Sequence, residues 1–269
     1  MADASDRLHA CSDSARLDAE ILVARAIDMP RSYLFAHPED TLDQFAIARL
    51  ETTIERRLAG LPMAYITGVR EFWSLELQVS PATLVPRPET ELLVELALRE
   101  IPRRADWQIL DLGTGSGAIA VAIAHERRSC RVTAVDSSAD ALAIAKLNVR
   151  SLDLANVDCL LGDWTAPVSA ARFQVIVSNP PYIALGDAAL AALSAEPELA
   201  LVSGSDGLNA IRTLSRDCRA ILTEGGMLIL EHGNEQQDVV AGILEADAWR
   251  DIKGYDDYAG RPRATTARL

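Results

Sequence analysis

Apolar residues recur every three or four positions through the first 60 residues, a period that predicts amphipathic helices. One predicted helix ends at the Met29-Pro30 break, and its apolar face is formed by Leu17, Ile21, Leu22, Ala24 and Ile27. Another is expected to run from an N-cap at Thr41 to about Leu58. Its apolar side consists of Phe45, Ile47, Ala48, Leu50, Ile54 and Leu58. Because no strand pattern interrupts these helices, residues 1–61 are predicted to form a small all-helical domain.

The pattern changes between residues 62 and 87. Tyr65–Gly68 and Glu71–Val79 combine aromatic residues with alternating apolar and polar positions, which is typical of strands. Because Gly68 separates the two runs, they predict a β-hairpin, and residues 62–87 are expected to link two domains. Pro88 then fits a helix start, with acidic residues in the first turn.

From residue 88 to residue 269, short apolar runs alternate with helical patterns. Helices are predicted at Glu89–Glu100, Ala118–Arg127, Ala139–Ser151 and Gly207–Leu222. Strands are predicted at Gln108–Asp111, Arg131–Asp136, Val157–Leu161, Phe173–Ser178, Met227–Glu231, Trp249–Gly254 and Ala264–Ala267. Strands that alternate with helices form mostly parallel sheets covered on both faces. The chain is therefore predicted to be an α/β protein with a Rossmann-like, seven-stranded sheet.

The charge balance limits the class of partner. The chain has 269 residues and a formal net charge of −13. Proteins that bind a nucleic-acid backbone usually carry a basic patch, and an acidic molecule opposes long-range capture of DNA or RNA. A protein or small-molecule substrate is therefore favoured, and no direct contact with nucleic acid is expected.

Cysteine and histidine spacing gives no metal-binding pattern. Cys11, Cys130, Cys159 and Cys218 are far apart, and the four histidines are scattered. We therefore expect reduced thiols and no metal site. Residues 1–10 contain Asp and Arg without an apolar run, and no apolar stretch reaches the roughly 20 residues of a membrane span. A monomeric cytoplasmic protein without a membrane partner is expected.

A glycine-rich loop follows the first strand of the α/β region and opens a helix. Glycines let the backbone turn sharply and approach a ligand, and the helix start offers free N–H donors. With Ala118 the spacing fits a loose dinucleotide fingerprint, but an acid before three alternating glycines resembles the first motif of class I methyltransferases. A carboxylate such as Asp111 suits the ammonium of S-adenosyl-L-methionine and not a pyrophosphate. The candidate cofactor-binding residues of this loop are Asp111, Gly113, Thr114, Gly115, Ser116 and Gly117.

The next two strand ends add further cofactor candidates. Asp136 ends the second strand, where a carboxylate can accept both hydroxyls of a ribose. A helix N-cap is the alternative role for Asp136, although Ser137 or Ser138 could cap that helix as well. Asp163 and Trp164 follow the third strand, where the first could accept the exocyclic amine of adenine and the second could form an apolar wall.

The segment Asn179–Tyr182 reads Asn-Pro-Pro-Tyr and follows the fourth strand, at the sheet edge where α/β proteins bind ligands. Its prolines remove two N–H donors and leave backbone carbonyls free to accept. The Asn179 side-chain oxygen and the Pro180 carbonyl can hold both hydrogens of a planar amide or amino group, which aims its nitrogen at a methyl donor. Tyr182 offers a flat face, or it only packs. The catalytic candidates are Asn179, Pro180 and Tyr182.

In order and spacing, the motifs resemble those of the bacterial release factor glutamine methyltransferases (PrmC/HemK type). The resemblance is carried by Pro62–Gly68, Glu71-Phe72, Pro86–Glu91, Asp111–Gly117, Asn179–Tyr182, Glu196-Pro197, Asp206–Leu208, Glu231–Gly233 and Ala259–Arg261. It implies methyl transfer from S-adenosyl-L-methionine to the side-chain N5 of glutamine in the Gly-Gly-Gln motif of peptide chain release factors 1 and 2, with S-adenosyl-L-homocysteine as product. The resemblance also implies that residues 1–61 dock the release factor and that residues 88–269 form the methyltransferase domain. By the same resemblance, Gly113–Gly117, Asp136, Trp164 and Asn179 contact the cofactor, while the glutamine is bound by Asn179, Pro180, Pro181 and Tyr182.

Other functions share part of this motif set. A glutamine methyltransferase acting on a ribosomal protein has the same active-site motifs. An N6-adenine nucleic-acid methyltransferase shares Asn-Pro-Pro-Tyr, but it would need a basic groove and a target-recognition domain. A nicotinamide-dependent dehydrogenase shares only the glycine loop, and a non-catalytic binding module leaves both loops without a purpose. The sequence therefore favours a protein-glutamine methyltransferase.

Overall fold

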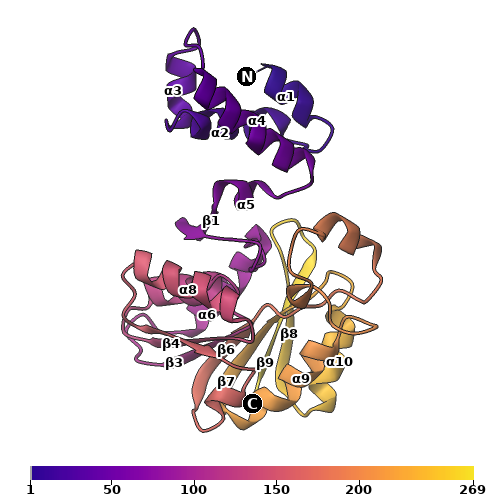
Figure 1. The fold of residues 1–269 in the computed structure, drawn as a ribbon. Helices are drawn as coiled ribbons and strands as arrows, with labels where there is room; N and C mark the ends of the chain where they lie inside the picture. Colours follow the sequence, from indigo (N-terminus) through magenta and orange to yellow (C-terminus); the bar gives the residue numbers. More distant parts are fainter. Residues whose placement is uncertain (1) are drawn as a thin grey trace. The chain divides into compact units, whose positions relative to one another are not determined.

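The computed structural model describes residues 2–269, and the chain divides between Val69 and Arg70 into two compact units (Figure 1). The division falls inside the predicted linker of residues 62–87. In the part of the chain that the structure describes, no helix is both long enough and apolar enough to cross a membrane.

The first unit is all-helical, as predicted. Its helices are α1 (Ala2–Leu8), α2 (Ala15–Ala26), α3 (Arg31–Ala36), α4 (Gln44–Leu58) and α5 (Met63–Thr67). Leu8, Leu22 and Ile54 are fully buried in its small apolar core. The buried carboxylate of Asp18 accepts a hydrogen bond of 3.0 Å from the Arg57 guanidinium, so that this charge is paired inside the unit.

Helix α4 departs from the prediction at its start and on one side. The N-cap is Asp43, whose Oδ1 accepts from the Ala46 amide at 2.7 Å, and not Thr41. Asp caps a helix at least as well as Thr, and only Asp43 adjoins the first turn. Leu50 and Ile54 are buried as expected, whereas Phe45 is 71% exposed.

The predicted hairpin strand at Tyr65–Gly68 is wrong, because these residues close helix α5. Gly68 has φ +78° and forms its left-handed C-cap, a common role for glycine. The hairpin lies just after it and pairs β1 (Val69–Phe72) with β2 (Leu75–Gln78). Trp73 and Ser74 turn the chain with φ values of +54° and +57°, as a tight two-residue hairpin turn requires.

The second unit contains the predicted α/β domain. Its helices are η1 (Pro88–Thr90), α6 (Glu91–Glu100), α7 (Ala118–Glu126), α8 (Ala139–Ser151), η2 (Ala166–Val168), η3 (Ala188–Leu193), η4 (Glu198–Ala200), α9 (Asn209–Asp217), η5 (Cys218–Ala220) and α10 (Gln237–Ala246). Its large sheet consists of β3 (Gln108–Leu112), β4 (Arg131–Asp136), β5 (Val157–Leu161), β6 (Phe173–Ser178), β7 (Leu222–Glu231), β8 (Arg250–Asp256) and β9 (Pro262–Arg268).

The seven strands lie in the order β5-β4-β3-β6-β7-β9-β8, which confirms the Rossmann-like sheet. β9 is antiparallel to both neighbours, and the other pairings are parallel. Side chains alternate between two buried clusters along each central strand. Ile109 belongs to the cluster that contains side chains of α6 and α7, while Leu110 belongs to the cluster that contains side chains of α9 and α10. The sheet is therefore covered on both faces, which explains its continuous apolar strands.

Two predicted boundaries and several short elements differ from the structure. The predicted helix Gly207–Leu222 ends earlier, because a 3₁₀ turn follows α9 and β7 already begins at Leu222. α10 and the short 3₁₀ helices between β6 and α9 were not predicted. A 3₁₀ turn is too short to show periodicity, and α10 buries only Val240 and Leu244, one helical turn apart, so that its buried face is short.

The register of the parallel strands places the predicted site residues together. Leu112 of β3 lies beside Val135 of β4 on one side and Ser178 of β6 on the other. The residues that follow these strands therefore share one edge of the sheet, which brings the glycine loop, Asp136 and Asn179 to neighbouring positions.

Candidate active site

A cavity of about 450 Å³ lies at this sheet edge in the second unit. That volume falls in the range of small-molecule sites. Eight of the predicted cofactor residues line it: Gly113, Thr114, Gly115, Ser116, Asp136, Asp163, Trp164 and Asn179. Pro181 lines it as well, whereas Asp111, Gly117, Pro180 and Tyr182 are not among its lining residues.

The glycine loop needs glycine at three positions, because Gly113, Gly115 and Gly117 all have positive φ, of +72°, +57° and +84°. A Cβ on Gly117 would lie 3.2 Å from the Cβ of Ala145 in α8, whereas the space around Gly115 is open to 4 Å. The loop is also tied to β4, since the Gly113 amide donates to the Val135 carbonyl at 2.9 Å. The result is a bent cradle that leaves room for a ligand.

Asp111 supports this loop from below. Its Oδ2 accepts from the Thr114 hydroxyl at 2.6 Å and from the Ala120 amide at 3.1 Å. Its Oδ1 is buried and has no hydrogen-bond partner among residues 2–269. Burial raises the pKa of Asp111 to about 7. An acceptor without a donor beside the cradle fits a ligand that carries a cationic amino group.

Asp136 connects the glycine loop to the start of α8. Its Oδ2 accepts from the Gly115 amide at 2.8 Å and its Oδ1 from the Ser138 amide at 2.9 Å. Ser138 is the N-cap of α8, since its hydroxyl oxygen accepts from the Ala141 amide at 3.2 Å. The capping role that was an alternative for Asp136 thus belongs to Ser138. A carboxylate has about four acceptor sites, so Asp136 keeps capacity for a ligand in the cavity that it lines.

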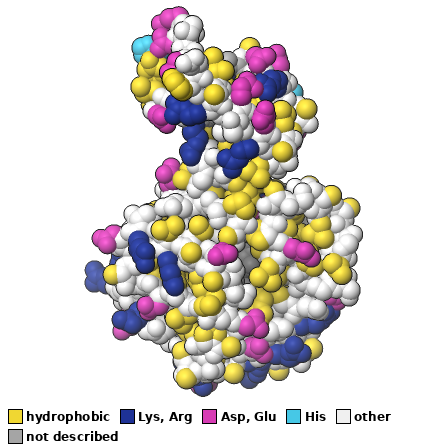
Figure 2. Space-filling view, in the orientation of Figure 1, with side chains coloured by type: hydrophobic (Ala, Val, Ile, Leu, Met, Phe, Trp, Pro, Cys, Tyr) yellow, Lys and Arg dark blue, Asp and Glu magenta, His cyan; other side chains and the backbone are white. Residues whose placement is uncertain are grey.

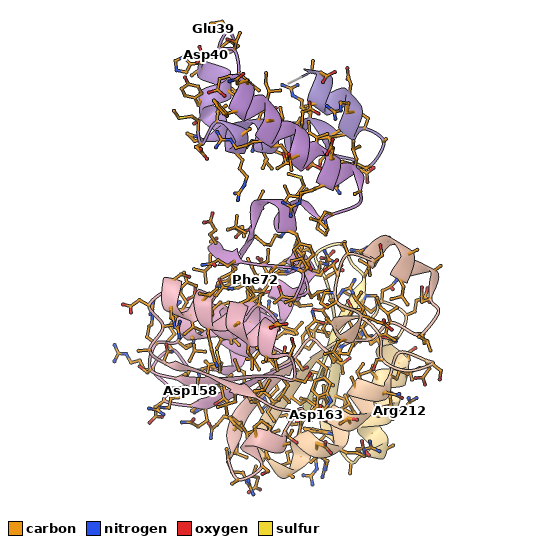
Figure 3. All side chains as sticks on the ribbon, viewed as in Figure 1. Glu39, Asp40, Phe72, Asp158, Asp163 and Arg212 are labelled. Carbon is orange, nitrogen blue, oxygen red and sulfur yellow. The ribbon has the colours of Figure 1, made fainter. Side chains whose placement is uncertain are left out.

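Trp164 forms an apolar wall of the cavity. Its indole carbon Cζ3 lies 3.6 Å from the position that a Cβ on Gly113 would take. Trp164 itself has φ +43°, a conformation that costs about 1–2 kcal/mol in a residue other than glycine. The preceding residue, Asp163, follows β5 and also lines the cavity (Figure 3).

Asn179 presents its side-chain oxygen without a competing donor. Its Nδ2 donates to the Thr90 hydroxyl at 3.2 Å. In the described chain, neither Asn179 Oδ1 nor the Pro180 carbonyl accepts a hydrogen bond. The end of β6 is fixed by Ser178, whose hydroxyl donates to the Leu112 carbonyl at 2.7 Å. These contacts hold two free acceptors at the sheet edge.

Tyr182 holds the same loop from its buried side. Its hydroxyl donates to Glu231 Oε1 at 3.2 Å, and its carbonyl accepts from Gln236 Nε2 at 3.0 Å. Burial, together with the charge of Glu231, raises the pKa of Tyr182. The phenol therefore stays protonated, and its contacts are those of a residue that packs and anchors the loop.

Several polar residues around the site were not singled out from the sequence. Glu231 is buried at the end of β7 and accepts from the Thr90 hydroxyl at 2.8 Å. Glu196 pairs with Arg87 and accepts from the Val85 amide at 3.0 Å, which ties the segment before η4 to the segment before η1. From the sequence, Glu231 and Glu196 were named only among the motifs that carry the family resemblance, and neither was given a role. A carboxylate closing an apolar strand is the signal that would have identified Glu231.

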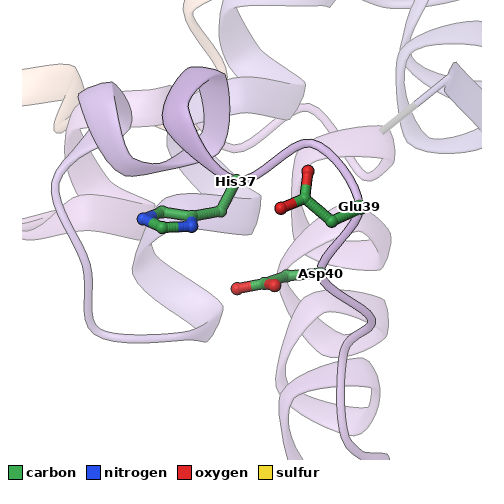
Figure 4. A group of neighbouring side chains, drawn as sticks. All are labelled: His37, Glu39 and Asp40. Atoms are coloured by element: carbon green, nitrogen blue, oxygen red, sulfur yellow. The ribbon is translucent and has the colours of Figure 1, made fainter.

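One group of possible metal ligands occurs within residues 2–269. The ligand atoms of His37, Glu39 and Asp40 lie within 4.8 Å of one another (Figure 4). All three side chains are exposed, and Asp40 already accepts from the Tyr33 hydroxyl at 2.7 Å. Exposed acidic groups often lie close together without a metal, so no metal centre is assigned.

Known proteins resemble this chain over nearly its full length. The model of the PrmC N-terminal domain matches residues 1–68, and that of the methyltransferase small domain matches residues 89–205. The release factor glutamine methyltransferase of Coxiella burnetii is 42% identical over 264 residues, which are 98% of this chain and 95% of that protein. The enzyme of the same name from Escherichia coli (strain K12) is 42% identical over 259 residues, 96% of this chain and 93% of its own.

A solved structure supports the fold. A methyltransferase from Pyrococcus furiosus has a TM-score of 0.55 with 20% sequence identity, and the match covers 81% of this chain and 96% of that chain. At this identity the likeness concerns the fold, which is that of a methyltransferase sheet.

Proposed function

The chain belongs to the release factor glutamine methyltransferase family, and from this premise we propose that it methylates the glutamine of the Gly-Gly-Gln motif in peptide chain release factors 1 and 2. The enzyme uses S-adenosyl-L-methionine, and the acceptor atom is the side-chain nitrogen N5. One observation carries the proposal for the site: among the described residues, neither the side-chain oxygen of Asn179, which lines the cavity, nor the carbonyl of the adjacent Pro180 accepts a hydrogen bond.

A glutamine amide is a poor nucleophile because its nitrogen lone pair is delocalised. When bound, S-adenosyl-L-methionine supplies a methyl group on a sulfonium. Asn179 Oδ1 and the Pro180 carbonyl each accept one N–H of the substrate amide, which orients the nitrogen and stabilises the positive charge that develops on it. The proton becomes acidic once the nitrogen is methylated, so that no strong base is needed. Pro181 and Tyr182 complete the substrate-binding loop, since Tyr182 anchors it to Glu231.

The cavity suits S-adenosyl-L-methionine in both charge and shape. The bent loop of Gly113–Gly117 gives backbone access, the unpartnered Oδ1 of Asp111 suits the cationic amino group, and Asp136 has acceptor capacity for ribose hydroxyls. Trp164 supplies an apolar surface for the adenine, and Asp163 an acceptor for its amine. We assign these residues to the cofactor.

Replacing Asp136 with alanine is expected to weaken binding of S-adenosyl-L-methionine about 10–100-fold, because hydrogen bonds to a charged group are lost. Isothermal calorimetry measures this change. Ser138→Ala is the matched control, since it removes the helix cap and leaves the carboxylate in place. Its expected effect is about 1 kcal/mol of stability with unchanged affinity. Equal affinity of wild type and Asp136→Ala would remove Asp136 from the cofactor site.

We further propose that the helical domain, residues 1–61, docks the release factor, and that residues 62–87 link it to the methyltransferase domain of residues 88–269. Apolar side chains reach the surface of the helical unit (Figure 2). Phe35, Phe45 and Ile47 are 56%, 71% and 47% exposed, and exposed apolar side chains are what a protein-docking surface offers. A monomeric enzyme that works in the cytoplasm without contacting nucleic acid agrees with the net charge of −13.

A labelled-methyl transfer assay distinguishes the candidate substrates. Purified release factor is expected to take up label from S-adenosyl-L-methionine, whereas duplex DNA is not. The control is a release factor whose Gly-Gly-Gln glutamine is replaced by alanine, which is expected to remain unlabelled. Labelling of a ribosomal protein in place of the release factor would transfer the same chemistry to another substrate, and labelling of DNA would overturn the proposal.

A further inference from the structure

A chain of hydrogen bonds runs from Asn179 through Thr90, which also lines the cavity, to Glu231, which does not line it. Asn179 Nδ2 lies 3.2 Å from the Thr90 hydroxyl, which lies 2.8 Å from Glu231 Oε2. Glu231 Oε1 accepts from the Tyr182 hydroxyl at 3.2 Å. Thr90 and Glu231 are 4% and 1% exposed, so that water does not compete for these bonds. The chain thus connects η1, the end of β7 and both ends of the Asn-Pro-Pro-Tyr loop.

The direction of each bond follows from Glu231. An ionised carboxylate only accepts, so the single hydroxyl proton of Thr90 is donated to it. The Thr90 oxygen then has only lone pairs to offer Asn179. An asparagine amide has nearly the same shape when its oxygen and nitrogen are exchanged, and its hydrogen bonds decide between the two orientations. Only the NH₂ group can donate to Thr90, which leaves the Asn179 oxygen to the cavity.

We propose that Glu231 is a positioning residue that acts through Thr90 to hold the Asn179 amide with its oxygen toward the substrate. The inference rests on the proposed function, since it concerns the glutamine amide that Asn179 would accept. The flipped side chain would place its NH₂ group against the NH₂ group of that glutamine, and two donors cannot bond. The Asn179 side chain can therefore bind the substrate amide in only one of its two orientations.

Protonation of Glu231 allows the donor and acceptor roles along these hydrogen bonds to be exchanged. A carboxylic acid can donate to the Thr90 oxygen, and the Thr90 hydrogen is then free for the oxygen of a flipped Asn179. Burial raises the pKa of Glu231 to about 7. The hydrogen bonds from Thr90 and Tyr182 and the charge of Arg263 on β9 act in the opposite direction and lower it. The charge of Glu89 on η1 raises the pKa of Glu231, and burial lowers the pKa of His232, the residue that follows Glu231.

The test compares Thr90→Val, which keeps the side-chain shape and removes the hydroxyl, with Thr90→Ser, which keeps the hydroxyl. Thr90→Val is expected to lower kcat about 10–100-fold, a loss typical of one polar group that positions a transition state, while Thr90→Ser retains most of the rate. The Kd for S-adenosyl-L-methionine is expected to change less than about threefold, because Thr90 is not among the residues assigned to the cofactor and valine keeps its shape at the cavity wall. Thr133→Val in β4 is the matched control for losing a threonine hydroxyl in this sheet, and thermal unfolding shows that each variant is folded.

The pH profile separates positioning from a structural role. Wild-type and Thr90→Ser kcat are expected to fall as pH decreases through about 7, whereas the profile of Thr90→Val is expected to be flat there, because Asn179 is no longer connected to Glu231. The proposal would be overturned if Thr90→Val had the kcat of the wild type, or if kcat of that variant still fell with decreasing pH as it does in the wild type.

A second measurement needs no methyl transfer and so separates this inference from the proposed function. The side-chain ¹⁵N–H signals of Asn179 are assigned by their loss in Asn179→Asp and followed between pH 6 and pH 8.5. They are expected to shift with the titration of Glu231 in the wild type and to stay fixed in Glu231→Gln and Thr90→Val. If release factor is not methylated but the signals shift, the proposed function fails and the positioning stands. If the signals do not respond to pH in an active enzyme, the positioning is wrong.

Discussion

Replacing Asn179 with alanine is expected to slow methyl transfer about 10²–10³-fold while S-adenosyl-L-methionine still binds. The variant loses the side-chain acceptor that is assigned to the substrate amide, and the Pro180 carbonyl alone cannot fix the plane of that amide. The backbone of the loop is unaffected, because Tyr182 and Ser178 anchor it on either side. Single-turnover rates with labelled cofactor measure the loss, and calorimetry measures binding of the cofactor.

Asn179→Asp provides the second arm of this experiment. A carboxylate has nearly the size of the amide but cannot donate to Thr90, and it brings a charge close to Glu231, with which Thr90 is already paired. This variant is also expected to be slow, although its side chain still offers oxygen acceptors. Turnover of Asn179→Ala at the wild-type rate would show that Asn179 does not hold the substrate.

Replacing Gly207 with alanine is expected to lower both activity and stability. Gly207 has φ +76°, and an added Cβ would lie 2.3 Å from the Tyr182 carbonyl oxygen and 3.0 Å from Gln236 Nε2. Because the nearest atom belongs to the backbone, the loop that carries Asn179 must move. Left-handed strain and overpacking together cost about 2–4 kcal/mol of unfolding free energy. A kcat at least about 10-fold lower is expected, since small displacements of a positioning group are costly.

Gly186 offers a matched control for this substitution. Its φ is +83°, almost the same as that of Gly207, but an added Cβ would meet nothing within 4 Å. Gly186→Ala therefore carries the backbone strain, about 1–2 kcal/mol, without the collision. Urea unfolding and kcat are measured for both variants. Equal activities in the two would mean that the close approach to Tyr182 has no part in placing Asn179.

The sequence predicted those parts of the fold that local pattern determines. The central strands of the large sheet contain buried apolar runs, and all seven strands were found, with the largest difference in bounds at the start of β7. The glycine loop and the Asn-Pro-Pro-Tyr loop follow such strands, and parallel pairing alone brings them together. The family and its chemistry followed from these loops and the motifs around them.

The errors and omissions have a common physical origin. Tyr65–Gly68 has the aromatic and β-branched residues of a strand, but the turn begun at Pro62 and the C-cap at Gly68 make it helical. Thr90 and Glu231 are 141 positions apart in the chain and become partners only when η1 packs against the end of β7. No local pattern contains such a contact, which is why the residues behind Asn179 were absent from the predicted site.

The place of β9 in the sheet has a consequence for the order in which the enzyme is made. β9 is the last strand in the chain, yet it lies between β7 and β8, and β8 joins the sheet only through it. It also pairs Ala264 with Glu231, the carboxylate behind the catalytic loop. During synthesis from the N-terminus, the residues of the cofactor cradle are thus present long before β9 pairs with Glu231. A nascent chain halted before residue 262 would have the methyl-donor half of its site and lack the finished support for its acceptor half.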